Sequence, residues 1–306
     1  MSVVVCENVV KEFGNCTAVN GVSLTMNRGE CFGVLGPNGA GKSTLISMIY
    51  GATSRTGGTL KVFGLDPQTQ SREIKKRLGV VTQEDCLDLA MSVEENMKMF
   101  AVFVGVPSAE IEIRVSALLK FMALDHKSKE PIRALSGGMK RRLVFVRALL
   151  SDPDLIILDE PTTGLDPAVR HLLWDKIREL KARGTTILLT THYMDEAERL
   201  CDRLVIMDQG KVQEEGAPKK LVSKHCPGYI AHFRAPANND PLKKIASQRP
   251  EIHYFEDSSG SGLRAPGLEQ ISAIVGDLQI EPEVVRPANL EDVFLMVTGR
   301  ELSANA

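Results

Sequence analysis

The chain has no excess of charge of one sign and no long apolar run. Its 306 residues contain 37 lysines and arginines against 39 aspartates and glutamates, which gives a formal net charge of −2. This balance argues against a nucleic-acid-binding surface held by bulk positive charge. The longest apolar stretch, residues 99–106, is far shorter than the ~20 residues of a membrane-spanning helix. The first residues show no basic flank before an apolar core, so we predict no signal peptide.

The six cysteines form no C-x-x-C pair and are widely and irregularly spaced. We therefore expect neither a zinc site nor a disulfide framework, and we interpret the cysteines as buried free thiols in a reducing cytosol. Apolar residues make up 43% of the chain. That share is enough for a sizeable core and argues against a disordered chain. Composition thus excludes several classes of protein but indicates no function.

The pattern of apolar runs, prolines and glycines changes at about residue 215. Within residues 1–215, short apolar runs alternate with segments of helical spacing, which predicts an α/β fold with a mostly parallel sheet. Residues 3–26 predict two strands, and 91–104 and 109–122 predict helices. Residues 216–306 have clustered prolines and glycines and short predicted elements. They indicate a second domain, a small C-terminal α+β extension with an accessory role.

A glycine-rich stretch follows the apolar run 31–35 and precedes a helix-like segment. It matches the P-loop pattern, in which glycines let backbone N–H groups turn toward phosphate oxygens at the positive end of a helix. Lys42 supplies a charge for the β- and γ-phosphates of a nucleotide, and the Ser43 hydroxyl is suited to bind Mg²⁺. The predicted nucleotide-binding residues of this stretch are Gly36, Pro37, Asn38, Gly39, Ala40, Gly41, Lys42, Ser43 and Thr44.

Two carboxylates follow the apolar run Leu-Ile-Ile-Leu at residues 155–158. A fully apolar run of this length is typical of a strand buried on both faces of a parallel sheet. In P-loop proteins an aspartate at such a strand end holds Mg²⁺, and we assign Asp159 this role. Glu160 can polarise the attacking water as a general base. The alternative for Glu160 is a solvent-facing acid in the turn before Pro161.

Residues 135–139, Leu-Ser-Gly-Gly-Met, lie between these two motifs. Together the three motifs resemble those of the ATP-binding subunits of ABC transporters, whose signature is Leu-Ser-Gly-Gly-Gln, with Met139 in place of the glutamine. The resemblance covers about residues 3–215. It implies a P-loop NTPase domain with an N-terminal antiparallel β part and a helical subdomain. It also implies that Ser136, Gly137 and Gly138 close over the ATP of a second copy.

Other positions match the same family one by one. Gln83 resembles the Q-loop glutamine, which touches Mg²⁺ and moves with the membrane subunit, and Asp166 resembles a D-loop residue that crosses to the partner subunit. His192 resembles the switch histidine that senses the γ-phosphate. Phe13 lies where the family places an aromatic ring against adenine, although it could simply be a core residue. The roles implied are catalysis by Glu160, His192 and Gln83 and metal binding by Ser43, Gln83 and Asp159.

Three longer segments, 135–143, 161–174 and 286–301, resemble a narrower branch, the nodulation-factor and daunorubicin-type export ATPases. That resemblance implies an ATP-hydrolysing exporter subunit that uses ATP and Mg²⁺ and works as a homodimer with two ATP molecules at a head-to-tail interface. It implies a separate ABC-2 type membrane permease as partner and no nucleic acid. The expected location is peripheral, at the cytoplasmic face of the inner (plasma) membrane.

Two other classes of protein are alternatives. A soluble ABC-type ATPase that acts on nucleic acid or ribosomes usually shows zinc-binding cysteine pairs, a long coiled coil or two tandem ATPase modules. This sequence has one P-loop and none of those features. A P-loop kinase or GTPase would lack the Ser-Gly-Gly element and the histidine at their present spacings. The exporter subunit is therefore the hypothesis that the motifs favour.

Overall fold

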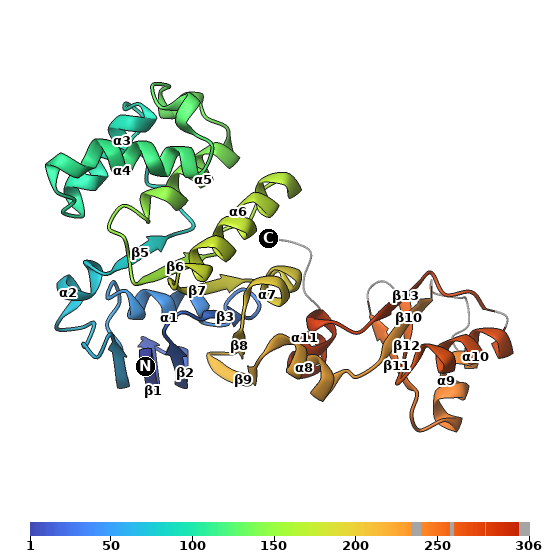
Figure 1. Cartoon of the computed structure of the whole chain (residues 1–306). Coiled ribbons are helices and arrows are strands. Elements are labelled where there is room, and N and C mark those ends of the chain that lie inside the picture. Colours follow the sequence, from blue (N-terminus) through green and yellow to red (C-terminus); the bar gives the residue numbers. More distant parts are fainter. Residues whose placement is uncertain (234–239, 258–259, 279, 300–306) are drawn as a thin grey trace. The chain divides into compact units, whose positions relative to one another are not determined.

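The chain divides into two compact units, Met1–Glu214 and Glu215–Ala306 (Figure 1). The computed structural model describes residues 1–233, 240–257, 260–278 and 280–299. Each unit has a hydrophobic core of its own. The predicted change of domain at residue 215 falls beside the boundary between these units.

The first unit contains an antiparallel sheet of three strands in the order β2-β1-β4. Strand β1 (Ser2–Phe13) pairs with β2 (Cys16–Asn27) on one side and with β4 (Gly57–Val62) on the other. In the second half of β2, buried and exposed residues alternate, so one face of the sheet joins the core. The predicted N-terminal antiparallel part is therefore confirmed, and β4 extends it.

The second sheet of this unit has six strands in the order β5-β6-β7-β3-β8-β9. Strands β5, β6, β7, β3 and β8 run parallel, as the sequence predicts. The run that forms β3 is buried at every residue, which fits a central strand covered on both faces. The strands are β3 (Cys31–Leu35), β5 (Leu78–Val81), β6 (Leu155–Asp159), β7 (Thr186–Thr191), β8 (Arg203–Asp208) and β9 (Lys211–Gly216).

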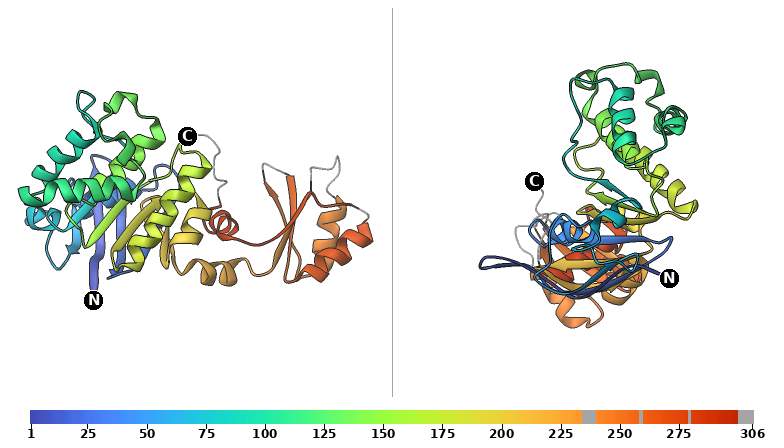
Figure 2. Two further views of the ribbon diagram at one scale, coloured as in Figure 1. Left: turned by 45° about the horizontal axis from the view of Figure 1, so that its top comes forward. Right: turned by 90° about the vertical axis from the view of Figure 1, so that its left-hand side faces the viewer.

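Helices of the first unit fall into two groups, which Figure 1 and Figure 2 show from three sides. One group lies with the parallel sheet: α1 (Lys42–Ile49), α2 (Ser71–Lys75), α6 (Pro167–Ala182) and α7 (Met194–Leu200). The other is the predicted helical subdomain: α3 (Val93–Phe103), α4 (Ser108–Phe121), the short 3₁₀ helices Asp125–Lys127 and Ile132–Ala134, and α5 (Gly137–Arg147). The hydroxyl of Ser136 caps α5, as predicted, because it accepts a hydrogen bond from the Met139 amide.

The second unit is built on an antiparallel sheet in the order β11-β12-β10-β13. Its strands are β10 (Tyr229–Phe233), β11 (His253–Asp257), β12 (Gly260–Ala265) and β13 (Val284–Pro287). Its helices are α8 (Pro218–His225), α9 (Asp240–Gln248), α10 (Leu268–Leu278) and α11 (Leu290–Thr298). Buried residues of α9, α10 and one sheet face form its core. The expected α+β extension is therefore present.

Some expectations differ from the structure. Strands β5, β9 and β12 and helices α2 and α8 were not predicted. The interpretation of all cysteines as buried is wrong for Cys16 and Cys86, which are exposed, while all six are free. No helix in the described part of the chain has the length and apolar character needed to cross a bilayer.

Candidate active site

Four neighbouring parallel strands end at one edge of the six-stranded sheet. Val81 of β5 pairs with Leu158 of β6, the next residue Asp159 pairs with Thr190 of β7, and β3 lies on the other side of β7. The carboxyl ends of these strands therefore lie at one level, where ligands bind in open α/β sheets. The P-loop, the Asp159–Glu160 pair and His192 all follow directly from these ends.

The P-loop between β3 and α1 needs glycine at particular positions. A Cβ at Gly36 would lie 2.3 Å from the Met207 carbonyl oxygen, and one at Gly41 would lie 2.2 Å from the Ala18 carbonyl oxygen. Gly41 also has a φ of +98°, which disfavours other residues. The first amides of an α-helix have no intrahelical partner, and α1, which begins at Lys42, has no side-chain cap to bind them. The loop thus directs the positive end of a helix toward the strand edge.

Lys42, Glu160 and His192 form one cluster across three strand ends. The Lys42 Nζ lies 3.8 Å from Glu160 Oε1, and the side chains of Lys42 and Glu160 are only 5% and 9% exposed. His192 Nδ1 lies 3.3 Å from the other carboxylate oxygen, Oε2, but without the geometry of a hydrogen bond. The Lys42 Nζ also donates to the carbonyl oxygens of Gly36 and Pro37 at 2.8 and 3.1 Å. The strand order explains this cluster. Lys42 follows β3, Glu160 follows β6 and His192 follows β7, and β7 is the one strand between the other two.

Burial shifts the titration of the charged groups at this edge. It lowers the pKa of the Lys42 ammonium, although the charges of Glu160 and Asp159 act in the opposite direction. Burial also raises the pKa of the Asp159 carboxyl, against the effect of a 2.6 Å hydrogen bond donated by the Thr190 hydroxyl. Opposite charges are thus concentrated in a partly desolvated site, which is the setting in which electrostatic catalysis is strongest.

The three residues expected to bind Mg²⁺ all offer oxygen atoms, the ligands that this ion prefers. They are the exposed Ser43 hydroxyl in the first turn of α1, the Asp159 carboxylate and the exposed Gln83 amide. The chemistry of this donor set therefore fits Mg²⁺. The site has few charged ligands, which suits an ion that is bound partly through substrate phosphates.

Four other predicted residues are exposed. Gln83 is exposed, and its side chain makes no hydrogen bond to another described residue. Ser136 and Gly137 are exposed at the start of α5, and Asp166 is exposed and caps α6 by accepting a bond from Val169 N–H at 3.0 Å. One chain thus leaves these partner-site residues at its surface.

Phe13 is 52% exposed, so the alternative that it is a core residue is wrong. It lies at the end of the β1–β2 hairpin, where it pairs with Cys16, and the Lys11 ammonium lies 4.5 Å above its ring. The same hairpin reaches the P-loop, because the Ala18 carbonyl lies against Gly41. Phe13 is therefore close in the fold to the P-loop and available at the surface.

Sequence reasoning missed three residues that support this edge. Thr190 binds both Asp159 and the Glu160 amide, and Arg141 binds the carbonyls of the turn that follows Asp159. Glu196, fully buried in α7, accepts hydrogen bonds from Thr162 and Trp174. None of the three left a distinct signal in the sequence, because the apolar run 143–146 gives Arg141 and Arg142 equivalent helical neighbours.

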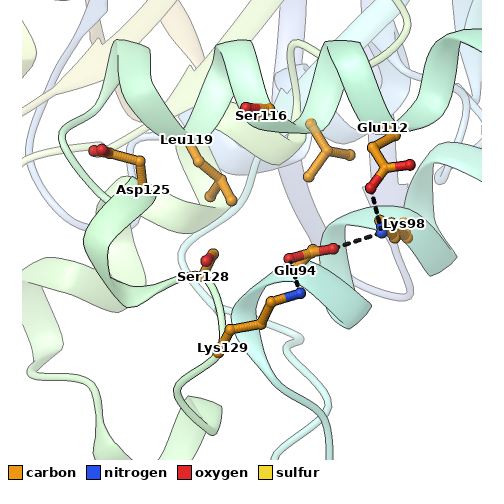
Figure 3. A pocket seen from close by; sticks show the side chains of 9 residues that line it. Glu94, Lys98, Glu112, Ser116, Leu119, Asp125, Ser128 and Lys129 are labelled. Carbon is orange, nitrogen blue, oxygen red and sulfur yellow. Dashed lines mark ion pairs between the residues drawn. The ribbon is translucent and has the colours of Figure 1, made fainter.

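A separate hollow of about 230 Å³ lies in the helical subdomain between α3, α4 and the segment after α4 (Figure 3). Its charges are largely paired with one another. Glu94 contacts Lys98 and Lys129 at 2.5 and 2.7 Å, and Lys98 lies 3.7 Å from Glu112. Mutual pairing of this kind points to helix packing and not to a ligand site.

Comparisons with known proteins agree with this geometry. A family model described as "ABC transporter" matches residues 19–163. The chain is 42% identical over 305 residues to the Nod factor export ATP-binding protein I of Ralstonia nicotianae, covering 97% of this chain and 94% of the relative. It is 44% identical over 296 residues to the protein of that name from Rhizobium meliloti, covering 96% and 88%.

Two solved structures of similar fold each cover about 70% of the chain. An ATP-binding subunit of an ABC transporter superposes with a TM-score of 0.67 at 30% identity, covering 72% of this chain and 92% of that one. A dimeric ATP-binding cassette in a post-hydrolysis state, bound to ADP and Pi, gives a TM-score of 0.64 at 25% identity, covering 70% and 98%.

Proposed function

Because this chain belongs to the ATP-binding proteins of ABC transporters, we propose that its strand-edge site hydrolyses ATP to drive an exporter. The observation that carries the proposal is the cluster of Lys42, Glu160 and His192. It combines a cation for phosphate, a carboxylate that can accept a proton and an imidazole beside that carboxylate. These are the parts that phosphoryl transfer to water requires.

Each side chain has a distinct task. Lys42 and the uncapped amides of α1 bind the β- and γ-phosphates. Glu160 accepts a proton from the attacking water, and His192, in contact with the second carboxylate oxygen, holds Glu160 in place and senses the γ-phosphate. Ser43, Gln83 and Asp159 would hold Mg²⁺, which when bound would neutralise negative charge on the phosphates. Phe13 provides a surface against which the adenine stacks.

The working unit is a two-fold dimer with two ATP molecules at the interface. Support comes from the exposure of Ser136, Gly137 and Asp166 in the single chain and from the dimeric cassette of similar fold. In such a dimer, the signature residues of one copy close over the ATP bound to the P-loop of the other. The first unit therefore carries the ATP-binding domain, and the second unit is an accessory domain.

Export is supported by the relatives named Nod factor export ATP-binding protein I, which match over nearly the whole chain. We infer that the transmembrane path belongs to a separate permease of the ABC-2 type. The permease holds this subunit at the cytoplasmic face of the membrane, where ATP is available. Co-expression with such a permease should bring the chain into the membrane fraction, and sedimentation that does not depend on the permease would contradict this partnership.

Lys42→Ala tests the site itself. Removal of the buried ammonium should sharply weaken ATP binding, measured by calorimetry with the full chain. Lys61→Ala, at an exposed position of β4, is a matched control that should bind ATP like the wild type. Circular dichroism would verify that both variants are folded. Unchanged ATP affinity in a folded Lys42→Ala protein would refute the assignment of the P-loop.

A further inference from the structure

Arg141 of helix α5 is a buried arginine whose partners are all backbone carbonyl groups. Its side chain is 7% exposed. Nε donates to the Pro161 carbonyl at 2.9 Å, and Nη2 donates to the Asp159 and Glu160 carbonyls at 3.0 and 2.9 Å. On the other side, Nη1 donates to the Thr82 carbonyl at 2.5 Å and more weakly to that of Gln83 at 3.4 Å. One guanidinium group thus joins two separate loops.

The first of these loops is the turn that carries Glu160. Glu160 has a φ of +47°, a left-handed conformation that is strained for a residue with a side chain. Such a conformation persists only where surrounding contacts enforce it. The Glu160 amide donates to the backbone and side-chain oxygens of Thr190, both at 3.1 Å. Arg141 holds the opposite side of the same peptide units, so the direction of the Glu160 side chain depends on both contacts.

The second loop is the segment that begins at Thr82, directly after β5. Because the fork of a guanidinium is planar and rigid, its donors cannot move independently. A shift of the Thr82 carbonyl therefore acts on the Arg141 side chain and through it on the carbonyls of Asp159 and Glu160. The arrangement is a mechanical link between the segment that holds Gln83 and the proposed general base.

We propose that Arg141 is a positioning residue for ATP hydrolysis: it fixes the turn of Glu160 in its left-handed conformation and ties the 82–83 segment to that turn. The inference rests on the proposed function. Through this link, the position of the segment that holds Gln83 sets the rate of the chemical step. Arg141 itself does not contact ATP. Arg141 therefore affects turnover through Glu160 and leaves nucleotide binding to the P-loop.

Arg147 provides a matched control on the same helix. It is also buried, and it donates to the Asp85 and Cys86 carbonyls at 2.9 and 2.7 Å. Arg147 thus holds a later part of the loop that begins at Thr82. These hydrogen bonds do not reach the turn of Glu160. Substitution of Arg147 removes a buried arginine–carbonyl contact from α5 without a direct effect on the catalytic turn.

The test compares Arg141→Lys and Arg147→Lys in the full chain, with each measured for phosphate release, ATP affinity and thermal stability. Lysine keeps the positive charge but lacks the planar group whose several N–H donors bind the carbonyls of both loops. A small misplacement of a reacting group can cost ~10²-fold in rate, so we expect kcat of Arg141→Lys to fall by ~10- to 10²-fold. KM and the calorimetric ATP affinity should change by no more than about threefold. Arg147→Lys should keep kcat within about threefold of the wild type.

A double-variant cycle separates positioning from general destabilisation. If Arg141 acts through Glu160, Arg141→Lys should cost nothing further in residual hydrolysis when Glu160 is already Gln, because effects of residues that act as a unit are not additive. An equal fold-loss in both backgrounds would overturn the inference. So would an equal loss of kcat in Arg147→Lys, or a loss of ATP affinity that accounts for the slower turnover.

The same measurements distinguish this inference from the proposed function. If the wild type binds and hydrolyses ATP and Glu160→Gln hydrolyses it far more slowly, the proposed function holds. A wild-type kcat in Arg141→Lys would then refute the positioning role alone. If the wild type itself fails to bind ATP, the proposed function fails, and Lys42→Ala would show no difference from the wild type.

Discussion

Glu160→Gln is the sharpest perturbation of the proposed chemistry. Glutamine keeps the length and volume of the side chain but removes its negative charge and the basic oxygen. In the structure one oxygen of Glu160 lies 3.8 Å from the Lys42 Nζ, and the other accepts a hydrogen bond from the Thr163 hydroxyl at 3.3 Å. The amide can keep the contact with Thr163 through its own oxygen. The substitution therefore changes the proton-accepting function with little change of shape.

The expected magnitude follows from the role of a general base. A positioned base contributes ~10²–10⁴ in rate, so phosphate release should fall by about that factor. At 1.36 kcal/mol for each factor of ten, this loss corresponds to about 2.7–5.4 kcal/mol of transition-state stabilisation. ATP binding should persist, because Lys42, Ser43 and Asp159 remain, and Lys42 is left with one carboxylate neighbour fewer to compete with the phosphates.

Blocked hydrolysis should also change the oligomeric state. ATP that contacts both copies stabilises the closed dimer by mass action, so the dimer of Glu160→Gln should accumulate when Mg-ATP is added. Light scattering with and without Mg-ATP measures this, beside an assay of phosphate release. Glu84→Gln, at an exposed acid of the loop after β5, is the control and should behave like the wild type.

Two results would refute this reasoning in different ways. Near-normal turnover of Glu160→Gln would remove Glu160 from the role of general base. Lost turnover without any ATP-dependent dimer would instead count against the two-copy site. Ser136 and Gly138 would then lack the phosphate contact assigned to them.

The remaining predictions concern a buried carboxyl and the second unit. Burial raises the pKa of Glu196 above its ordinary 4.5, so the folded protein holds a proton that the unfolded chain releases, and stability falls as pH rises through the window between the two pKa values. Glu196→Gln should remove this loss, so its Tm should rise relative to that of the wild type as pH increases above about 4.5. The fluorescence of the single tryptophan, Trp174, which is buried and donates a hydrogen bond to Glu196, reports the unfolding. A constant Tm difference would contradict the raised pKa. A chain ending after Ala217 should still bind ATP in calorimetry, because every proposed nucleotide-binding residue precedes it; a soluble truncated chain that does not bind ATP would show that the second unit is required.

The sequence predicts the first unit well where strands are fully apolar. Residues 31–35 and 155–158 belong to β3 and β6. Each apolar run is too short for a helix and ends at a glycine or an acidic residue, so it predicts a buried strand. Strand β12 (Gly260–Ala265) was missed because its sequence, Gly-Ser-Gly-Leu-Arg-Ala, has no β-branched or aromatic residue. Its stability comes from elsewhere in the sheet. The ring of Phe255 lies over Gly262, where a Cβ would be only 2.1 Å from the ring.

For the site, motifs predict the residues but not the contacts between them. The P-loop and the acidic strand end are local patterns, and the sheet order that brings Lys42 to Glu160 is a property of the whole fold. Arg141 was missed because a run of Lys-Arg-Arg usually marks a solvated face. Residues 143–147 of α5 are all buried, so helical spacing gives Arg142, which is only partly buried, the same apolar neighbours as Arg141. The inward position of Arg141 is therefore a property of the fold.

Because Lys42 and Glu160 form a buried ion pair, Glu160→Gln and Lys42→Ala have different physical consequences. When one partner of a buried ion pair is removed, the remaining charge is left uncompensated, at a cost of about 3–5 kcal/mol. In Glu160→Gln the remaining charge is the ammonium of Lys42, which Asp159 and the phosphates of ATP can still neutralise. In Lys42→Ala the remaining charge is the carboxylate of Glu160, beside a second carboxylate and opposite phosphates of the same sign. The Arg141 guanidinium still acts on this carboxylate, and the His192 imidazole lies 3.3 Å away, but the ion pair with Lys42 is lost. The same electrostatics therefore explain why the proposed binding residue must be a cation and why the general base can be neutralised without loss of the nucleotide.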